Sequence, residues 1–198
     1  MQYAAAGPGD ALGSNGSVQN LNTGEFFGTI QAAVDAASDG ATIVVYPGTH
    51  VENVNVNRQL TIKSASGTPL DTVVRASSPG SHVFYVSANN VIISGITISG
   101  ANQNAPCSGV YFTGTRGCTL ENNIISGNWY GISLDNSTGN NLNNNIVSSN
   151  LGTGICLVSS VGNKLTGNMI SSNSENGFWL KDGSNSNILT GNSANSNT

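Results

Sequence analysis

The sequence is poor in charge: only 8% of its 198 residues are Asp, Glu, Lys or Arg, against about 25% in an average soluble domain. Six lysines and arginines leave no basic surface for nucleic acid. No apolar run approaches the roughly 18 residues that a membrane span requires. A net charge of −4 favours solubility rather than a charged partner. Nucleic-acid binding and membrane insertion are therefore not expected.

The sequence has few cysteines and no visible secretion signal. The three cysteines, Cys107, Cys118 and Cys156, are an odd number and form no disulfide framework. A disulfide between Cys107 and Cys118 is one alternative, and the simpler interpretation is that both are buried thiols. The start shows no basic segment followed by an apolar one, so either a signal was removed or the protein is cytosolic. Residues 1–25 are expected to be an extended or loosely packed lead-in.

Asparagine and glycine take the place of charge, with 29 and 25 residues respectively. Both are poor helix formers, so the composition fits either disorder or a fold with many regular turns. An internal repeat favours the fold with many regular turns. Three positions recur at steps of 22, 23 and 24 residues. They are Leu120, Leu142, Leu165 and Leu189; Asn123, Asn145, Asn168 and Asn192; and Asn128, Asn150, Asn173 and Asn197. A glycine before each Ile/Phe-x-Leu or Val-x-Phe segment recurs at Gly109, Gly131, Gly154 and Gly177.

Each repeat alternates apolar and polar residues over short segments, which is typical of strands. A unit of 22 to 24 residues is too short for a helical pair, so each should be one coil of strands stacked on the next. The repeated leucines should then point inward. The repeated asparagines should occupy turns, where Asn tolerates left-handed backbone, and should bond from coil to coil as a ladder.

The pattern predicts an all-β, right-handed, single-stranded parallel β-helix of roughly six or seven coils over residues 26–198. The coils become regular from about residue 87, residues 100–108 form a looped-out insertion, and no cap is visible at the C-terminal end. A short helix over about 29–38, capped by Thr29, should close the first coil.

Two segments resemble the pectin-lyase-like superfamily of right-handed parallel β-helices. Residues 27–52 match that superfamily's N-terminal cap and first coil, and the Asn-rich repeats resemble the NosD-like, carbohydrate-binding-and-sugar-hydrolase type. The resemblance covers about residues 26–197 and implies an extracellular or cell-surface location, because such repeats are common in surface proteins. The superfamily holds enzymes, adhesins and structural proteins, so the fold alone assigns no activity.

The resemblance makes a polysaccharide lyase, hydrolase or epimerase the first enzyme hypothesis. Its candidate catalytic residues are Asp135 and Glu121, with Lys181 as the basic residue. The site would span the insertion and the face that carries Tyr111 and Asp135. Glycoside cleavage needs two carboxyl groups roughly 5 to 9.5 Å apart, and no two acids stand at matching positions of neighbouring repeats. Solvated surface acids are the simpler interpretation.

The sequence contains few residues that could bind a metal ion. NosD itself is linked to copper-site assembly, but two histidines, two methionines and three scattered cysteines predict no dedicated copper site. Calcium-binding repeats would need Asp where Asn stands. One Ca²⁺ on turn carbonyls is the only cofactor left open, and nothing in the sequence supports it.

A binding face is the better candidate. Tyr111 and Trp179 occupy the outward position of the glycine-led strand, and Trp129 and Tyr130 lie in the turn before it. Exposed aromatic rings beside Asn and Ser suit sugar rings, although these rings could instead pack under loops. The sequence therefore predicts a structural or carbohydrate-binding module of the cell surface, with a polysaccharide or surface glycan as partner and no catalysis of its own. End-to-end self-association, or further domains of a longer chain, is the second alternative.

Overall fold

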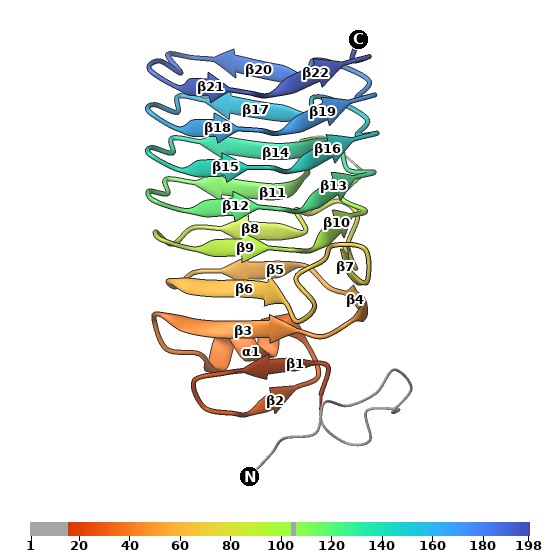
Figure 1. Cartoon of the computed structure of the whole chain (residues 1–198), viewed down its shortest axis with the longest axis vertical. Helices are drawn as coiled ribbons and strands as arrows, with labels where there is room; N and C mark the ends of the chain where they lie inside the picture. The colour runs from red at the N-terminus through yellow and green to blue at the C-terminus, as the bar shows by residue number, and fades with distance from the viewer. Residues whose placement is uncertain (1–15, 104–105) are drawn as a thin grey trace.

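The computed structural model describes residues 16–103 and 106–198, which form a stack of coils (Figure 1). Each regular coil gives one strand to each of three parallel sheets. The nine-stranded sheet contains, in spatial order, β2 (Phe26–Phe27), β1 (Val18–Asn20), β3 (Ala41–Val45), β6 (Leu60–Ser64), β9 (Ile92–Ser94), β12 (Thr119–Glu121), β15 (Asn141–Asn143), β18 (Lys164–Thr166) and β21 (Ile188–Thr190). The seven-stranded sheet contains β4 (Gly48–Val51), β7 (Thr72–Arg75), β10 (Thr97–Ser99), β13 (Ile124–Ser126), β16 (Ile146–Ser148), β19 (Met169–Ser171) and β22 (Ser193–Asn195). The six-stranded sheet contains β5 (Val54–Val56), β8 (Phe84–Val86), β11 (Ser108–Thr113), β14 (Tyr130–Asp135), β17 (Ile155–Val158) and β20 (Phe178–Lys181).

The pairing between coils confirms the parallel β-helix of about seven coils. Leu120 pairs with Leu142, and Leu142 pairs in turn with Leu165, as the repeat predicts. These leucines and the inward apolar residues of the other two sheets are buried in one continuous core. Because side chains alternate along a strand, the residues between them face outward and form columns along the stack.

The first coil is closed by a small cap. Helix α1 (Ile30–Ala36) buries Ile30, Ala33 and Val34, and the Thr29 side chain accepts a hydrogen bond from the Ala32 amide at 3.1 Å. Strands β1 and β2 add to the nine-stranded sheet as antiparallel strands below β3 (Figure 1). Within the predicted lead-in, residues 18–20 are an extended strand whose backbone pairs with β3. Residues 1–15 lie outside the described part of the chain.

The corners of the coils confirm the asparagine ladder and correct its explanation. The Asn145 side chain accepts from the Asn123 amide and Nδ2, and donates to Asn168 Oδ1 at 3.0 Å. The left-handed backbone belongs to the preceding residue, as at Asn122 (φ 55°) and Asn144 (φ 53°). A left-handed residue therefore makes the turn, and the next side chain points inward and bonds to the neighbouring coil. Further ladders run through Asn140, Asn163 and Asn187 and through Ser137, Ser160 and Ser184.

The last coil leaves part of the apolar column open. Leu180 and Leu189, which continue the inward columns, are 39% and 42% exposed. Self-association through this end stays a prediction.

Candidate functional site

One outward column of the six-stranded sheet gathers the aromatic residues. In register, Asn55 of β5 is followed by Tyr85, Tyr111, Ser133, Cys156 and Trp179. The inward neighbours, such as Val110 and Phe112, fill the core, so the alternation of the strand places this column on the surface. The column runs parallel to the axis of the coils.

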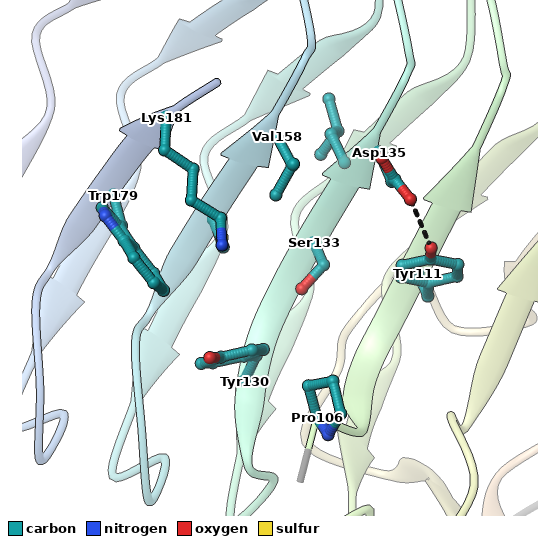
Figure 2. Close-up of a pocket in the computed structure, with 10 residues that line it drawn as sticks. Pro106, Tyr111, Tyr130, Ser133, Asp135, Val158, Trp179 and Lys181 are labelled. Atoms are coloured by element: carbon teal, nitrogen blue, oxygen red, sulfur yellow. Dashed lines mark hydrogen bonds between the residues drawn. The ribbon is translucent and has the colours of Figure 1, made fainter. Parts of the chain in front are cut away.

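A hollow of about 200 Å³ lies over the C-terminal part of this column (Figure 2). Tyr111 and Pro106 stand on one side of it, and Trp179 and Lys181 stand on the other (Figure 2). Tyr130, Ser133, Leu134, Asp135, Cys156 and Val158 complete the lining. Small side chains on the two middle coils leave space between the large ones, which is why a hollow forms there.

The Tyr111 hydroxyl donates a hydrogen bond of 2.9 Å to Asp135 Oδ2 on the next coil (Figure 2). Burial raises the pKa of Tyr111 to about 12, and the hydrogen bond to Asp135 and its negative charge act in the same direction. A phenol with so high a pKa remains protonated at neutral pH. It can donate hydrogen bonds, but it is a poor source of the phenolate that a general base would need.

The other side of the hollow carries the positive charge. Lys181 Nζ lies 4.2 Å from the centre of the Trp179 ring, a cation–π contact. Between the two sides, burial raises the pKa of the Cys156 thiol to about 11, against the opposing effect of the Lys181 charge. Cys156 is therefore an uncharged part of the floor, and the hollow offers aromatic faces with one acid and one base at its rim.

Of the predicted site residues, Tyr111, Tyr130, Trp179, Asp135 and Lys181 meet in this hollow. Trp129 is not among its lining residues. Its ring lies against Gly152 of the next coil, so close that a Cβ added to Gly152 would lie 3.1 Å from Trp129 Nε1. Glu121 lies on β12 in the nine-stranded sheet, in register with Asn143 rather than with an acid. Cys118 is a buried free thiol, so no bridge joins it to Cys107.

Sequence reasoning missed an aromatic cluster beside the hollow. The His82 ring stacks on Tyr111 with centroids 4.3 Å apart and an angle of 9° between the rings, and Tyr85 lies 5.7 Å from Tyr111. His82 Nδ1 accepts a hydrogen bond from the Ser108 amide, and burial lowers the pKa of His82. The Val-Phe-Tyr-Val alternation over 83–86 could have placed Tyr85 outward, but no sequence signal links His82 to Tyr111.

The acid–base groups of the hollow do not match a glycosidase pair. Among its described lining residues Asp135 is the one carboxylate, whereas glycoside hydrolysis uses two. In the cap, the Glu52 carboxylate accepts hydrogen bonds from the Ile30 and Gln31 amides at 2.9 Å. The His50 ring is hydrogen-bonded to the Tyr46 carbonyl oxygen, so both residues have structural roles.

Within residues 16–103 and 106–198, no group of three or more His, Cys, Asp or Glu is arranged to hold a metal ion. No helix in that part of the chain is both long and apolar enough to span a bilayer. The expectation that the protein needs no cofactor stays a prediction.

The model of the NosD family, described as "Periplasmic copper-binding protein (NosD)", matches residues 34–198. The chain belongs to the NosD family. The described residues offer no donor set that would fit the copper of that description. His50 and His82 each bond to a local partner, and no group of three or more His, Cys, Asp or Glu surrounds either of them.

This NosD-family chain is also similar to a surface glycoprotein and to two solved structures. It is 38% identical over 110 residues to a cell surface glycoprotein of Methanothermus fervidus, covering 54% of this chain and 17% of that protein. Its fold matches an alginate lyase of Paenibacillus sp. with a TM-score of 0.72 and 20% identity, over 82% of this chain and 62% of the lyase. It also matches a pectate lyase with a TM-score of 0.67 and 19% identity, over 81% and 46% of the two chains. The two lyases share the pectin-lyase-like fold, and at such identity the likeness concerns the fold alone.

Proposed function

We propose that this chain is a glycan-binding β-helix module of a cell-surface or other extracytoplasmic protein, without catalysis of its own. The observation that carries the proposal is the hollow on the six-stranded sheet, where Tyr111, Tyr130 and Trp179 surround a floor of small side chains. Sugar rings stack on aromatic faces through their C–H groups, while their hydroxyls bond to polar groups at the edge. The similarity to a cell surface glycoprotein supports the location.

The charged residues of the hollow are Lys181 and Asp135, and Lys181 favours an acidic sugar as the ligand. Lys181 can pair with a carboxylate or sulfate of a sugar that stacks on Trp179. Asp135 is already engaged by Tyr111, so it offers its remaining acceptor sites to sugar hydroxyls. Acidic polysaccharides should therefore bind more tightly than neutral ones.

The test is a binding measurement against polygalacturonate, alginate and the neutral polymer hydroxyethylcellulose, by affinity electrophoresis and calorimetry. Trp179→Ala should weaken binding about tenfold, because it removes one aromatic platform worth roughly 1 to 2 kcal/mol. Met169→Ala is the matched control, since Met169 is a large exposed side chain on the seven-stranded sheet. Binding to none of the three polymers, or equal losses in both variants, would contradict the proposal.

A polysaccharide-active enzyme is the second candidate, because Asp135 and Lys181 line the same hollow. The same polymers should be incubated with the protein and assayed for new reducing ends and for unsaturated products. We expect neither product. Turnover that disappears in both Asp135→Asn and Lys181→Ala, but persists in the matched variant Lys164→Ala on β18, would establish the enzyme instead.

A further inference from the structure

A second hollow, of about 330 Å³, lies on the same face toward the N-terminal coils. Asn55, Ser81, His82 and Tyr85 contribute to its lining. Asn55 and Tyr85 belong to the outward column that continues into the first hollow. The two hollows are therefore parts of one surface rather than sites on different faces.

The wall of this second hollow is held in place before any ligand arrives. The Asn53 side chain donates to the His82 carbonyl oxygen at 2.7 Å, and its Oδ1 accepts from the Ser78 amide and the Ser77 hydroxyl at 2.8 Å. These bonds tie the loop over residues 77–82 to the coil below it. A preorganised wall lowers the entropic cost of binding.

The two hollows share one partition. Tyr111 lines the first hollow, while His82 and Tyr85 line the second. The His82 ring covers Tyr111 at 4.3 Å, so a ligand in one hollow touches the same aromatic stack as a ligand in the other. The partition is made of ring faces and edges, which a sugar chain can cross without losing contact.

The spacing suits a polymer rather than a single sugar. Tyr85 and Trp179 stand four coils apart in the column, which is about 19 Å at the 4.8 Å separation of neighbouring strands. Tyr85 is 38% exposed and Trp179 half-buried, so both present ring surface to the solvent. No monosaccharide can reach both.

We propose that the second hollow is a further sugar subsite of the same groove. One linear glycan then lies along the six-stranded sheet, parallel to the coil axis, and stacks on Tyr85 near one end and on Trp179 near the other. This inference rests on the proposed function and adds to it that the ligand is a linear polymer spanning several coils.

The test is the dependence of affinity on chain length. Oligogalacturonides, alginate oligomers and cello-oligosaccharides from disaccharide to octasaccharide are titrated into the full chain by calorimetry. Affinity should rise by about tenfold or more between the shortest and longest members of the series that binds. Tyr85→Ala should remove that gain, so that its effect on affinity grows with chain length, whereas Trp179→Ala should weaken every length.

Two control variants separate ring contact from folding. Tyr85→Leu keeps an apolar side chain on the strand but removes the ring face, and it should behave as Tyr85→Ala does. Ile146→Ala, at a position 39% exposed on the seven-stranded sheet, should change nothing. Circular dichroism and thermal unfolding verify that each variant folds.

The outcomes distinguish this inference from the proposed function. Binding that is sensitive to Trp179→Ala but equal for all lengths, or unaffected by both Tyr85 variants, would overturn the second subsite and leave the module glycan-binding. Failure of the polymers and of all oligomers to bind would overturn both proposals together.

Discussion

At the scale of single residues, the corners of the coils depend on a pair of neighbours with different tasks. The first, such as Asn144, adopts left-handed backbone, and the second, such as Asn145, turns its amide into the core. Asn145 is fully buried, yet its donors and its acceptor are all used. An amide can do this in every coil because it donates and accepts at once.

The ladder can be tested by removing one rung. Asn145→Ala removes the acceptor of the Asn123 amide and one of the two acceptors of Asn123 Nδ2, and each buried N–H left unpaired costs about 1 to 3 kcal/mol. We expect a loss of roughly 3 kcal/mol in the free energy of unfolding, measured by urea denaturation. Asn143→Ala is the control, because that outward side chain lies two positions away on β15. Equal effects at the two positions would refute the importance of the ladder.

Tyr111 gives a second residue-scale prediction. Its pKa is raised to about 12, so between the usual value for tyrosine near 10 and about 12 the unfolded chain loses this proton before the folded chain does. The contribution of Tyr111 to stability should therefore be constant below about pH 10 and be lost as the pH rises toward 12. The phenolate absorbance, compared with that of Tyr111→Phe, reports the titration. Asp135→Asn should move the pKa of Tyr111 down but not to its ordinary value, since burial remains. An unchanged titration in that variant would show that Asp135 has no influence.

At the scale of elements, helix α1 is held at both ends by the next coil. The Glu52 carboxylate accepts from the first two helical amides, and Arg58 donates to the carbonyl oxygens of Asp35 and Ala37 at the other end. These contacts place negative charge at the helix N-terminus and positive charge at its C-terminus, which favours the helix dipole. A helix of only seven residues has little stability of its own.

The cap should weaken when either contact is lost. Glu52→Ala leaves the Ile30 and Gln31 amides without a side-chain acceptor, and the expected loss is about 1 to 2 kcal/mol. Chemical denaturation measures it, and hydrogen exchange should show the loss concentrated in α1 and β3. Glu25→Ala, an exposed acid of the same cap, serves as the control and should have little effect. A similar loss in the control would point to net charge as the cause.

At the scale of the whole molecule, each coil contacts only its neighbours, so stability should be nearly a sum over coils and their interfaces. Deleting residues 141–163 removes one complete period and joins Asn140 to Lys164. Asn187 then occupies the ladder position of Asn163, and β18 pairs with β12 in the same register that β15 had. The shortened chain should fold with an unchanged type of circular dichroism spectrum and a lower melting temperature.

A half-period deletion is the contrasting case. Removing residues 141–151 shifts the inward columns out of register and places polar side chains in the core, so this chain should not fold. Similar spectra and melting temperatures for the two deletions would contradict the additive stack.

Much of this architecture could be predicted from the spacing of a few residues. The common period of Leu120, Leu142 and Leu165 predicts their register, and the outward position of Tyr111 and Trp179 follows from it. The His82–Tyr111 stack could not be predicted, because it depends on the path of the loop over residues 77–82, which lies outside the regular repeats. Which aromatic residues meet in the hollow depends in the same way on local turns, as Trp129 shows by packing on Gly152.

The ladder also bears on the surroundings in which the molecule can work. Its rungs are amides and hydroxyls, which neither gain nor lose a proton over the pH range of natural waters. They carry no net charge, so dissolved salt has nothing to screen. The ladder should therefore keep the same hydrogen bonds in brine and in mild acid. The charged contacts of Glu52 and Arg58 at the ends of α1, and the Lys181 charge beside Trp179, should instead be weakened by salt.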